Sequence, residues 1–407
     1  MGEQPPADND WSNLPADVLT TVFCQLEFPD LLRSAAVCTT WRSTVRAVHR
    51  LGVYNCPQTP CLIYTTAAGG PRAAELFSLA DKNIYRRRIP DPPIGERNIV
   101  GSSHGWLVTA DARSELHLLN PATGEQLALP PVATIEQVNP VLNHDGGIER
   151  YELSFYDATH PRKEYEEPTP YRVDELRHAL YLKVVLSCDP SRGDCIAIMI
   201  HNPYRQLLFA RVGDKKWHWV TTYREYSDCI FQDGAFYAMN LLGGIHRYTI
   251  GGSCATRDVI FKDTSPFIAH NVYISGTPSG DVLQIWRMTV YTYREPQELH
   301  TTRIEVYKAD FDKQKIVAVH SLGDDALFIG HNHTFCISTK DYPQLLPNHV
   351  YFTDDDEYWL FDGRDGRRDV GIYSLEDKCV KDVVSPQKWL NWPVPVWITP
   401  CFTKILK

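Results

Sequence analysis

The feature that most constrains the fold is a β-rich unit that recurs at even spacing beyond Tyr54. Each unit has an apolar strand, a tight polar turn, a second strand, another turn and a third strand. Successive units begin near residues 61, 105, 194, 234, 281, 325 and 357. Most steps are about 40–50 residues long and one is about twice that length. Antiparallel repeats of this length form propeller blades, so the pattern predicts an all-β propeller.

The repeat spacing also predicts the number of blades. Roughly 350 residues divided by the period give between seven and eight units, so we expect seven blades, with six or eight as alternatives where insertions lengthen single units. One poorly marked unit is expected between Pro131 and Val184. An open β-sandwich is the alternative fold, but it does not explain the even period. The density of turns excludes a helical solenoid.

Two segments of the repeat region carry further expectations. The stretch from Ile135 to Leu180 matches the repeat least and is expected to be an exposed inserted loop, with one short helix over Arg172 to Leu180. Trp217 and Trp219 stand two residues apart on one predicted strand. Alternate residues of a strand share a face, so we expect both indoles in the core between blades.

The first fifty residues show helical rather than β periodicity. Apolar residues of one wide helical stripe fall at Leu14, Val18, Leu19, Val22, Phe23 and Leu26. Pro15 suits the first turn of this helix, and Pro29 is expected to end it, with Asp30 capping the next helix. A third helical segment follows Thr40. Three short helices cannot bury this much apolar surface alone, so they either dock on the rest of the chain or present a face to a partner.

Four motifs in this segment, in order and without gaps, resemble an F-box. They are W-x-x-L-P from Trp11, D-V-L from Asp17, D-L-L-R from Asp30 and V-C-x-x-W-R from Val37. The resemblance implies a small all-α F-box of three helices that docks on the Skp adaptor of SCF ubiquitin ligases and, through it, on a cullin. It also implies that the rest of the chain binds a protein substrate, whose identity the sequence does not give.

The resemblance further implies the adaptor-binding residues and the domain limits. Leu14, Pro15, Val18 and Leu19 begin the docking surface, and five further residues continue it or brace the helices: Leu31, Leu32, Val37, Cys38 and Trp41. The F-box is expected over residues 10–50 and the substrate-binding propeller over residues 56–402. The passage "GSSHGWLV…LLNPATGEQLALPP" is similar to the start of the divergent propeller in plant F-box proteins.

A G-x-S-x-G pattern at Gly101, Ser103 and Gly105 raises the question of a catalytic serine. A hydrolase nucleophile sits on a turn from a strand into a helix. The residues after Gly105 are aromatic and β-branched and then alternate, which predicts a strand rather than a helix. We therefore expect this pattern to open a β-hairpin, with no catalytic role for Ser103.

Composition and cysteine spacing argue against several classes of partner and cofactor. Lys plus Arg number 41 against 50 Asp plus Glu, and the net charge of −9 argues against nucleic acid or an anionic membrane as partner. No apolar stretch is long enough to span a membrane, and no signal segment is evident, so cytoplasm or nucleus is expected. The eleven cysteines form no C-x-x-C pair, so no metal and no cofactor are expected.

Two other functions stay open on sequence grounds. The first is a propeller-fold hydrolase or lyase with a helical appendage, which would need several carboxylates or histidines to converge at the central channel. The second is an F-box scaffold that binds the adaptor without promoting degradation. We favour the non-enzymatic substrate receptor, because the sequence contains no recognisable catalytic motif.

Overall fold

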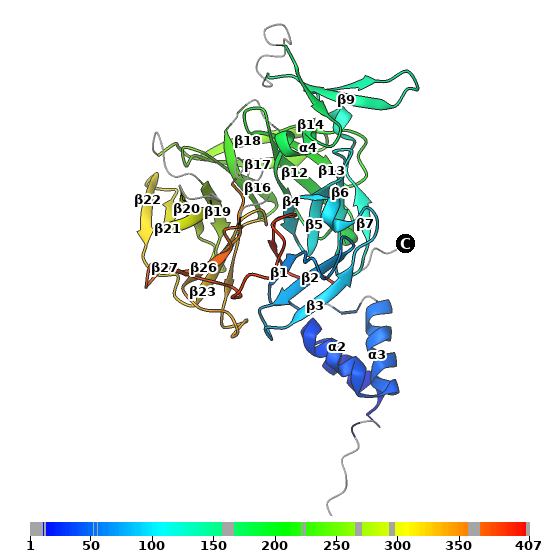
Figure 1. The fold of residues 1–407 in the computed structure, drawn as a ribbon. Coiled ribbons are helices and arrows are strands. Elements are labelled where there is room, and N and C mark those ends of the chain that lie inside the picture. Colours follow the sequence, from blue (N-terminus) through cyan, green and yellow to red (C-terminus); the bar gives the residue numbers. More distant parts are fainter. Residues whose placement is uncertain are drawn as a thin grey trace, which may run out of the picture.

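The computed structural model describes residues 11, 14–51, 53–54, 56–156, 167–220, 223, 225–264, 271–292, 298–356 and 367–403. Three helices come first and are followed by a ring of β-sheets (Figure 1). The predicted fold class, a small all-α unit followed by an all-β propeller, is confirmed. No helix in the described ranges is long and apolar enough to cross a membrane.

The three helices, called the helical unit below, are α1 (Ala16–Phe23), α2 (Phe28–Val37) and α3 (Thr39–Arg50). Pro15 precedes α1 as its N-cap. The prediction for Pro29 and Asp30 was wrong, because Pro29 lies in the first turn of α2 and Glu27 is the N-cap. The first turn of a helix has N–H groups without helical partners, so proline fits there. Asp30 lies within the same turn, near the positive end of the helix dipole.

Six sheets have four or five strands, and the strands within a sheet pair in antiparallel fashion except β23 with β25. The first sheet contains β28 (Val396–Ile398), β1 (Cys61–Tyr64), β2 (Ala73–Ser78) and β3 (Ile84–Arg88). The second contains β4 (Asn98–Ser103), β5 (Trp106–Ala110), β6 (Leu116–Leu119) and β7 (Gln126–Ala128).

The next sheets follow in chain order. One contains β11 (Tyr181–Leu186), β12 (Ile196–His201), β13 (Gln206–Arg211) and β14 (His218–Trp219). The next contains β15 (Tyr226–Gln232), β16 (Ala235–Asn240), β17 (Ile245–Gly251) and β18 (Cys254–Phe261). Another contains β19 (Asn271–Gly276), β20 (Val282–Tyr291), β21 (Leu299–Asp310) and β22 (Lys315–Val319). The last contains β23 (Asp325–Ile329), β24 (Phe335–Ser338), β25 (His349–Phe352), β26 (Gly371–Ser374) and β27 (Cys379–Lys381).

The ring closes where β28 pairs with β1 inside the first sheet. Trp397 of β28 is fully buried, and its indole lies 5.4 Å from the Phe328 ring and 5.7 Å from the Tyr351 ring of the last sheet. The first and last sheets therefore pack against each other through aromatic side chains. In a propeller each sheet keeps only short inner and outer edge strands, which limits edge-to-edge association.

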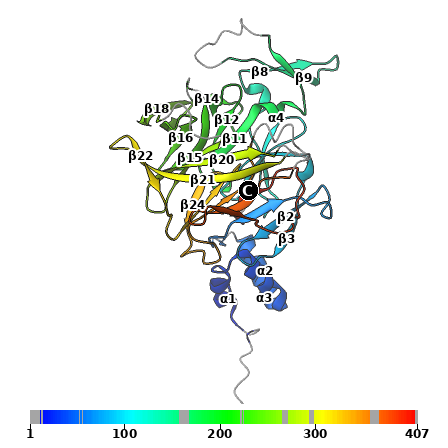
Figure 2. The same ribbon diagram turned by 60° about the vertical axis from the view of Figure 1, so that its left-hand side comes forward.

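A seventh sheet in the described residues has only three strands, β8 (Val138–Leu142), β9 (Ile148–Leu153) and β10 (Thr169–Arg172). Seven sheets match the predicted number of repeat units, and this one is the poorly marked unit. It projects from the ring at the end opposite the helical unit (Figures 1 and 2). Strands β4 and β11 contact each other directly, so six sheets supply the inner strands of the ring.

The segment expected to be an inserted loop is thus partly a sheet. Residues 157–166 of that segment lie outside the described residues. The predicted short helix is present as α4 (Leu176–Leu180). Trp217 belongs to the apolar cluster between the second sheet and the β11–β14 sheet, and Trp219 packs against it, which confirms the expected role of both indoles.

Candidate functional site

The helical unit has its own small core. Leu19, Phe23 and Leu31 are at most 1% exposed and pack with Val45 and Val48 of α3. The Trp41 ring lies 5.3 Å from the Phe23 ring in an edge-on arrangement. These side chains hold the three helices together, because their apolar surface is already withdrawn from water.

Other apolar side chains of the helical unit remain in contact with water. Val18 and Val22 are 43% and 48% exposed, and they stand four residues apart on one face of α1. Val37, the last residue of α2, is 61% exposed, and Pro15 is exposed as well. Aliphatic side chains at this exposure are accessible to a partner. We call Pro15, Val18, Val22 and Val37 the exposed apolar face.

The opposite side of α2 is fixed to the propeller. Phe28 is 3% exposed, and its ring lies 4.8 Å from the Tyr85 ring of β3 and 5.7 Å from the Phe402 ring. Leu32 packs against the same apolar cluster. The Phe28 amide donates a hydrogen bond of 2.7 Å to Oε1 of Gln58. The α2 helix therefore shares an apolar core with the first sheet.

Polar contacts in the connecting segment strengthen this attachment. Glu27 accepts hydrogen bonds from the Thr59 amide at 2.9 Å and from Thr59 Oγ1 at 2.8 Å. The hydroxyl of Tyr54 donates to the Leu26 carbonyl at 2.6 Å, and Gln58 Nε2 donates to Tyr54 at 2.8 Å. The segment from α3 to β1 is tied to the connection between α1 and α2 and to the first residue of α2, which fixes the orientation of the helical unit on the propeller.

The nine residues expected at the adaptor surface therefore divide into separate groups. Pro15, Val18 and Val37 are exposed, and Leu19 and Leu31 are buried in the helical core. Half-buried positions include Leu32, which faces the propeller, and three that belong to the helical unit: Leu14, Cys38 and Trp41. Cys38 accepts a weak hydrogen bond from the Trp41 amide.

Sequence reasoning did not single out Val22 as an exposed apolar residue, although its spacing of four residues from Val18 was a usable signal. It also missed Phe28, whose role depends on Phe402, a residue at the other end of the chain. A phenylalanine at the start of a helix carries no sequence signal that distinguishes docking on a distant segment from packing within the helix.

The G-x-S-x-G pattern forms a hairpin, as predicted. Ser103 ends β4 and pairs with Trp106, the first residue of β5. The two turn residues, His104 and Gly105, have φ angles of 50° and 81°, which is the left-handed backbone of a tight two-residue hairpin turn. Ser103 is 1% exposed, and its hydroxyl has no hydrogen-bond partner among the described residues. A serine so enclosed is not placed to attack a substrate.

Charged side chains do converge near the axis, but each described carboxylate there faces a cation. Lys183 Nζ lies 2.6 Å from Asp228 Oδ1, and the two side chains are 7% and 0% exposed. The other Asp228 oxygen accepts hydrogen bonds from Thr334 Oγ1 at 2.6 Å and from the Ile274 amide at 3.1 Å. Lys183 also donates to the Gly330 carbonyl at 3.1 Å. These partners satisfy a buried ion pair.

A second buried group lies between the last two sheets. Arg287 is 0% exposed and contacts Asp355 at 3.1 Å and Asp369 at 2.9 Å. Arg368 and Asp354 are both fully buried, 3.6 Å apart. Burial raises the pKa of Asp354 to about 7, although the two neighbouring arginines act against it. A cavity of about 40 Å³ lies beside Lys183 and Asp355, and this volume suits water rather than an organic substrate.

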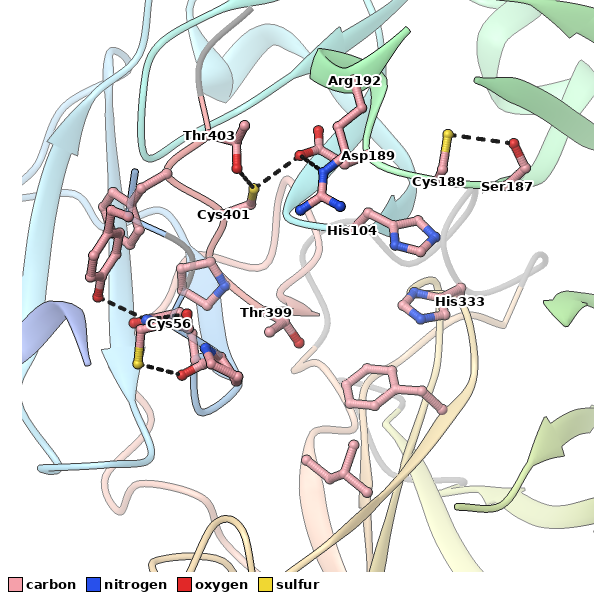
Figure 3. A pocket seen from close by; sticks show the side chains of 17 residues that line it. Cys56, His104, Ser187, Cys188, Asp189, Arg192, His333, Thr399, Cys401 and Thr403 are labelled. Atoms are coloured by element: carbon pink, nitrogen blue, oxygen red, sulfur yellow. Dashed lines mark hydrogen bonds and ion pairs between the residues drawn. The ribbon is translucent and has the colours of Figure 1, made fainter. Parts of the chain in front are cut away.

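A larger cavity lies beside the segment joining α3 to β1. This cavity, called the linker pocket, measures about 620 Å³. Its walls come from Tyr54 and residues 56–58, from the turns at His104 and His333, from the loop carrying Asp189 and Arg192, and from residues 399–403. Figure 3 shows the two imidazoles facing each other across from residues 399–403. Among the described residues, no group of His, Cys, Asp and Glu could hold a metal ion.

Two known protein families match most of the chain. The family described as KIB1-4 beta-propeller matches residues 76–374, and the F-box domain family matches residues 11–51. A putative F-box protein of Arabidopsis thaliana is 22% identical over 400 residues, covering 96% of this chain and 97% of the relative. F-box protein SKIP23 of the same plant is 24% identical over 426 residues, covering 96% of each chain.

A further relative, F-box only protein 7 of Arabidopsis thaliana, is 24% identical and covers 82% of each chain. Among solved structures, apo AztD from Citrobacter koseri is 9% identical, covers 85% of this chain and 98% of that chain, and has a TM-score of 0.34. At this TM-score the likeness supports no inference on function.

Proposed function

The chain belongs to the F-box proteins that carry a KIB1-4 β-propeller, and on this premise we propose that it is the substrate receptor of an SCF-type ubiquitin ligase. In this proposal the F-box, residues 10–50, docks on the Skp adaptor and through it on a cullin. The propeller, residues 56–402, binds a target protein. Proteins of the F-box family act as adaptors rather than catalysts, and we propose that this chain supplies no catalytic residue.

The observation that carries the proposal is the two-sided helical unit. One side of α2 is fixed to the propeller through Phe28 and Leu32. The exposed apolar face remains open on α1 and at the end of α2. The exposure of Val18 and Val37 leaves both side chains accessible to a partner.

The mechanism that we propose is placement. A receptor that holds its target beside a ubiquitin carrier raises the effective concentration of target lysines without any new chemistry. Rigid attachment serves this purpose, because an adaptor held by the F-box then has a fixed position relative to the propeller. The contacts of Phe28, Glu27 and Tyr54 with the propeller and connecting segment support such a fixed geometry.

The axial groups support the non-enzymatic proposal over a propeller hydrolase or lyase. Such an enzyme needs carboxylates or histidines that reach a substrate. Asp228 is paired with buried Lys183, and Asp354 with buried Arg368. The cavity that touches Lys183 measures about 40 Å³, which is too small for an organic substrate.

The differences in exposure among the expected adaptor-binding residues support separate roles for them. We propose that Pro15, Val18 and Val37 contact the adaptor, with Val22 added to them. Leu19 and Leu31 would contribute indirectly, by holding the helices in place. Substitution of Leu19 would therefore test folding rather than contact, and exposed positions are the better choice for an experiment.

The test is adaptor binding by the full chain with single Val→Asp substitutions. We expect Val18→Asp and Val37→Asp each to weaken binding to recombinant Skp adaptor by about tenfold or more, since a carboxylate at an apolar contact loses its hydration without gaining a partner. Val317→Asp is the matched control. Val317 is 52% exposed on β22 of the propeller, so the same change should leave adaptor binding unaltered.

Isothermal titration calorimetry would give the affinities, and circular dichroism would verify that each chain is folded. Absence of adaptor binding by the folded wild-type chain would reject the receptor proposal. Adaptor binding without ubiquitin transfer to any associated protein in a reconstituted ligase would instead favour the scaffold role. Equal binding by the Val18 and Val317 variants would show that the contact lies elsewhere.

A further inference from the structure

Two cysteines lie opposite each other just beyond the paired ends of β11 and β12. The ladder between these strands runs in regular register to Leu186, the last residue of β11. One residue further, the Ser187 amide donates a hydrogen bond of 2.9 Å to the Ile196 carbonyl, and the Ile196 amide donates to Ser187 Oγ at 2.9 Å. The same register, continued by one more residue, places Cys188 opposite Cys195.

The geometry of this pair suits a disulfide. Hydrogen bonds join Ser187 to Ile196, so the next pair is of the non-hydrogen-bonded type, in which the two Cα atoms are about 4.5 Å apart and the side chains are closest. A disulfide joins Cα atoms about 4.4–6.8 Å apart. Cys195 Sγ lies 3.2 Å from the Cys188 carbonyl oxygen, which places the sulfur directly against its neighbour. Both residues are free cysteines.

The two cysteines differ in their access to solvent. Cys195 is 0% exposed within the apolar cluster between the second sheet and the β11–β14 sheet, and the half-buried Cys188 packs against that cluster. Cys188 also lines the linker pocket (Figure 3). Burial raises the pKa of Cys195 to about 12, and the neighbouring Cys188 acts in the same direction. A small reagent therefore reaches Cys188 through the pocket, while the Cys195 thiol is shielded from it.

We propose that Cys188 and Cys195 are an oxidation site, which forms a disulfide when the chain meets a small peroxide such as hydrogen peroxide. The Cys188 thiolate attacks one peroxide oxygen and the O–O bond breaks, so Cys188 becomes a sulfenic acid and the departing hydroxide takes up the thiol proton. Cys195 then attacks the Cys188 sulfur, the S–S bond forms, and the sulfenic oxygen leaves as water with the Cys195 proton. Two thiols are oxidised to one disulfide, and one peroxide is reduced to two waters.

The disulfide closes a ring around the loop of residues 189–194, which forms part of the linker pocket wall. Asp189 Oδ1 in this loop accepts hydrogen bonds from Trp106 Nε1 at 2.9 Å and from the Ser191 amide at 3.0 Å. The Cys401 thiol lies 3.4 Å from the other Asp189 oxygen. Oxidation would thus constrain a loop that joins a propeller strand to the segment after β28. This inference goes beyond the receptor function, and its test requires neither adaptor nor substrate, so each proposal can fail without the other.

Peptide mapping of the reduced full chain after treatment with hydrogen peroxide tests the proposal. Remaining thiols are blocked with N-ethylmaleimide, and trypsin cleavage at Arg192 places the two cysteines on separate peptides, residues 184–192 and 193–205. A disulfide between them gives a linked pair that a reductant separates. We expect this pair to be at least about tenfold more abundant than any other pairing of Cys188, because the two cysteines meet without backbone movement.

Three variants make the assignment specific, with circular dichroism to verify folding. Cys188→Ala and Cys195→Ala should each abolish the linked pair, and in Cys195→Ala the sulfenic acid of Cys188 should persist and be trapped by dimedone. Cys336→Ala is the matched control and should leave the linked pair unchanged, since Cys336 is a half-buried cysteine of β24 outside the linker pocket. The proposal is wrong if the folded wild-type chain gives no linked pair, or if Cys188 pairs with other cysteines as often as with Cys195.

Discussion

Truncation of Phe28 should release the helical unit from the propeller without unfolding either part. The ring is 3% exposed and packs against Tyr85 and Phe402. Replacement of a buried phenylalanine by alanine costs about 3–5 kcal/mol, through lost burial and the cavity that remains. The helical core of Leu19 and Phe23 does not include this ring, so the helices should stay together while their attachment weakens.

The size of this effect depends on the contacts that would still hold the helical unit to the propeller after the Phe28 ring is removed. The ion pair between Arg33 and Asp81 is about half exposed on the arginine side and is worth about 0–1 kcal/mol. The hydrogen bonds between Glu27 and Thr59 depend on the same docked position. A loss of about 3–5 kcal/mol corresponds to at least about a hundredfold change in the opening equilibrium.

Amide hydrogen exchange of the full chain, followed by mass spectrometry, would measure this opening. In Phe28→Ala, peptides covering residues 28–37 and 56–63 should exchange at least about a hundredfold faster, while the inner strands of the propeller keep their protection. Val22→Ala is the matched control, because Val22 is 48% exposed and its truncation should change stability by no more than about 0.5 kcal/mol. Unchanged protection in a folded Phe28→Ala chain would refute the reasoning.

Two further substitutions test the packing of the ring. A Cβ atom on Gly101 would lie 2.3 Å from the Val184 carbonyl oxygen, so Gly101→Ala should lower the free energy of unfolding by about 1–3 kcal/mol in urea titrations, whereas Gly251→Ala, with open space around it, should not. Burial lowers the pKa of His201 to about 4, so the folded chain favours the neutral ring. The stability that this neutral ring contributes is complete above the unfolded pKa near 6.5 and is lost as the pH falls toward 4. When the pH is lowered from 7 to 5, the free energy of unfolding of the His201→Asn variant should therefore fall by about 2 kcal/mol less than that of the wild-type chain, and an equal fall in both chains would contradict the lowered pKa of His201.

The architecture could be predicted from the sequence because it depends on local patterns of residues. Helical spacing in the first fifty residues identified Leu19 and Phe23, which are the buried centre of α1. The even recurrence of strands and turns predicted the propeller, including the weak unit that became the three-stranded sheet. The hairpin at Ser103 followed from the strand-like residues after Gly105. Each of these features is decided by neighbours in the chain.

The candidate sites depend on contacts that local patterns do not encode. Lys183 and Asp228 lie on strands of two different sheets and Thr334 just precedes β24 of a third, so the three meet only when the ring is closed. In the sequence, each of these residues resembles an ordinary polar residue of a strand or turn. The same holds for the linker pocket, where His104 and His333 are brought together by the arrangement of the blades.

The ends of the helices could not be predicted from local sequence patterns either. Proline was expected to end α1, but it occupies the first turn of α2 instead. The two positions differ by only a few residues, and proline is acceptable both after a helix and in its first turn, so its presence alone does not locate the boundary.

The closure of the first sheet by β28 makes assembly depend on synthesis of nearly the whole propeller. The F-box leaves the ribosome first, and β1 to β3 soon after it, yet β28 and Phe402 follow only after all the other sheets. Until then the Phe28 side chain lacks the Phe402 part of its docking site. Contacts between such distant segments are also slow to form. A chain interrupted during translation would therefore carry a loosely held F-box, and only a finished ring would hold the adaptor-binding helices in their working orientation.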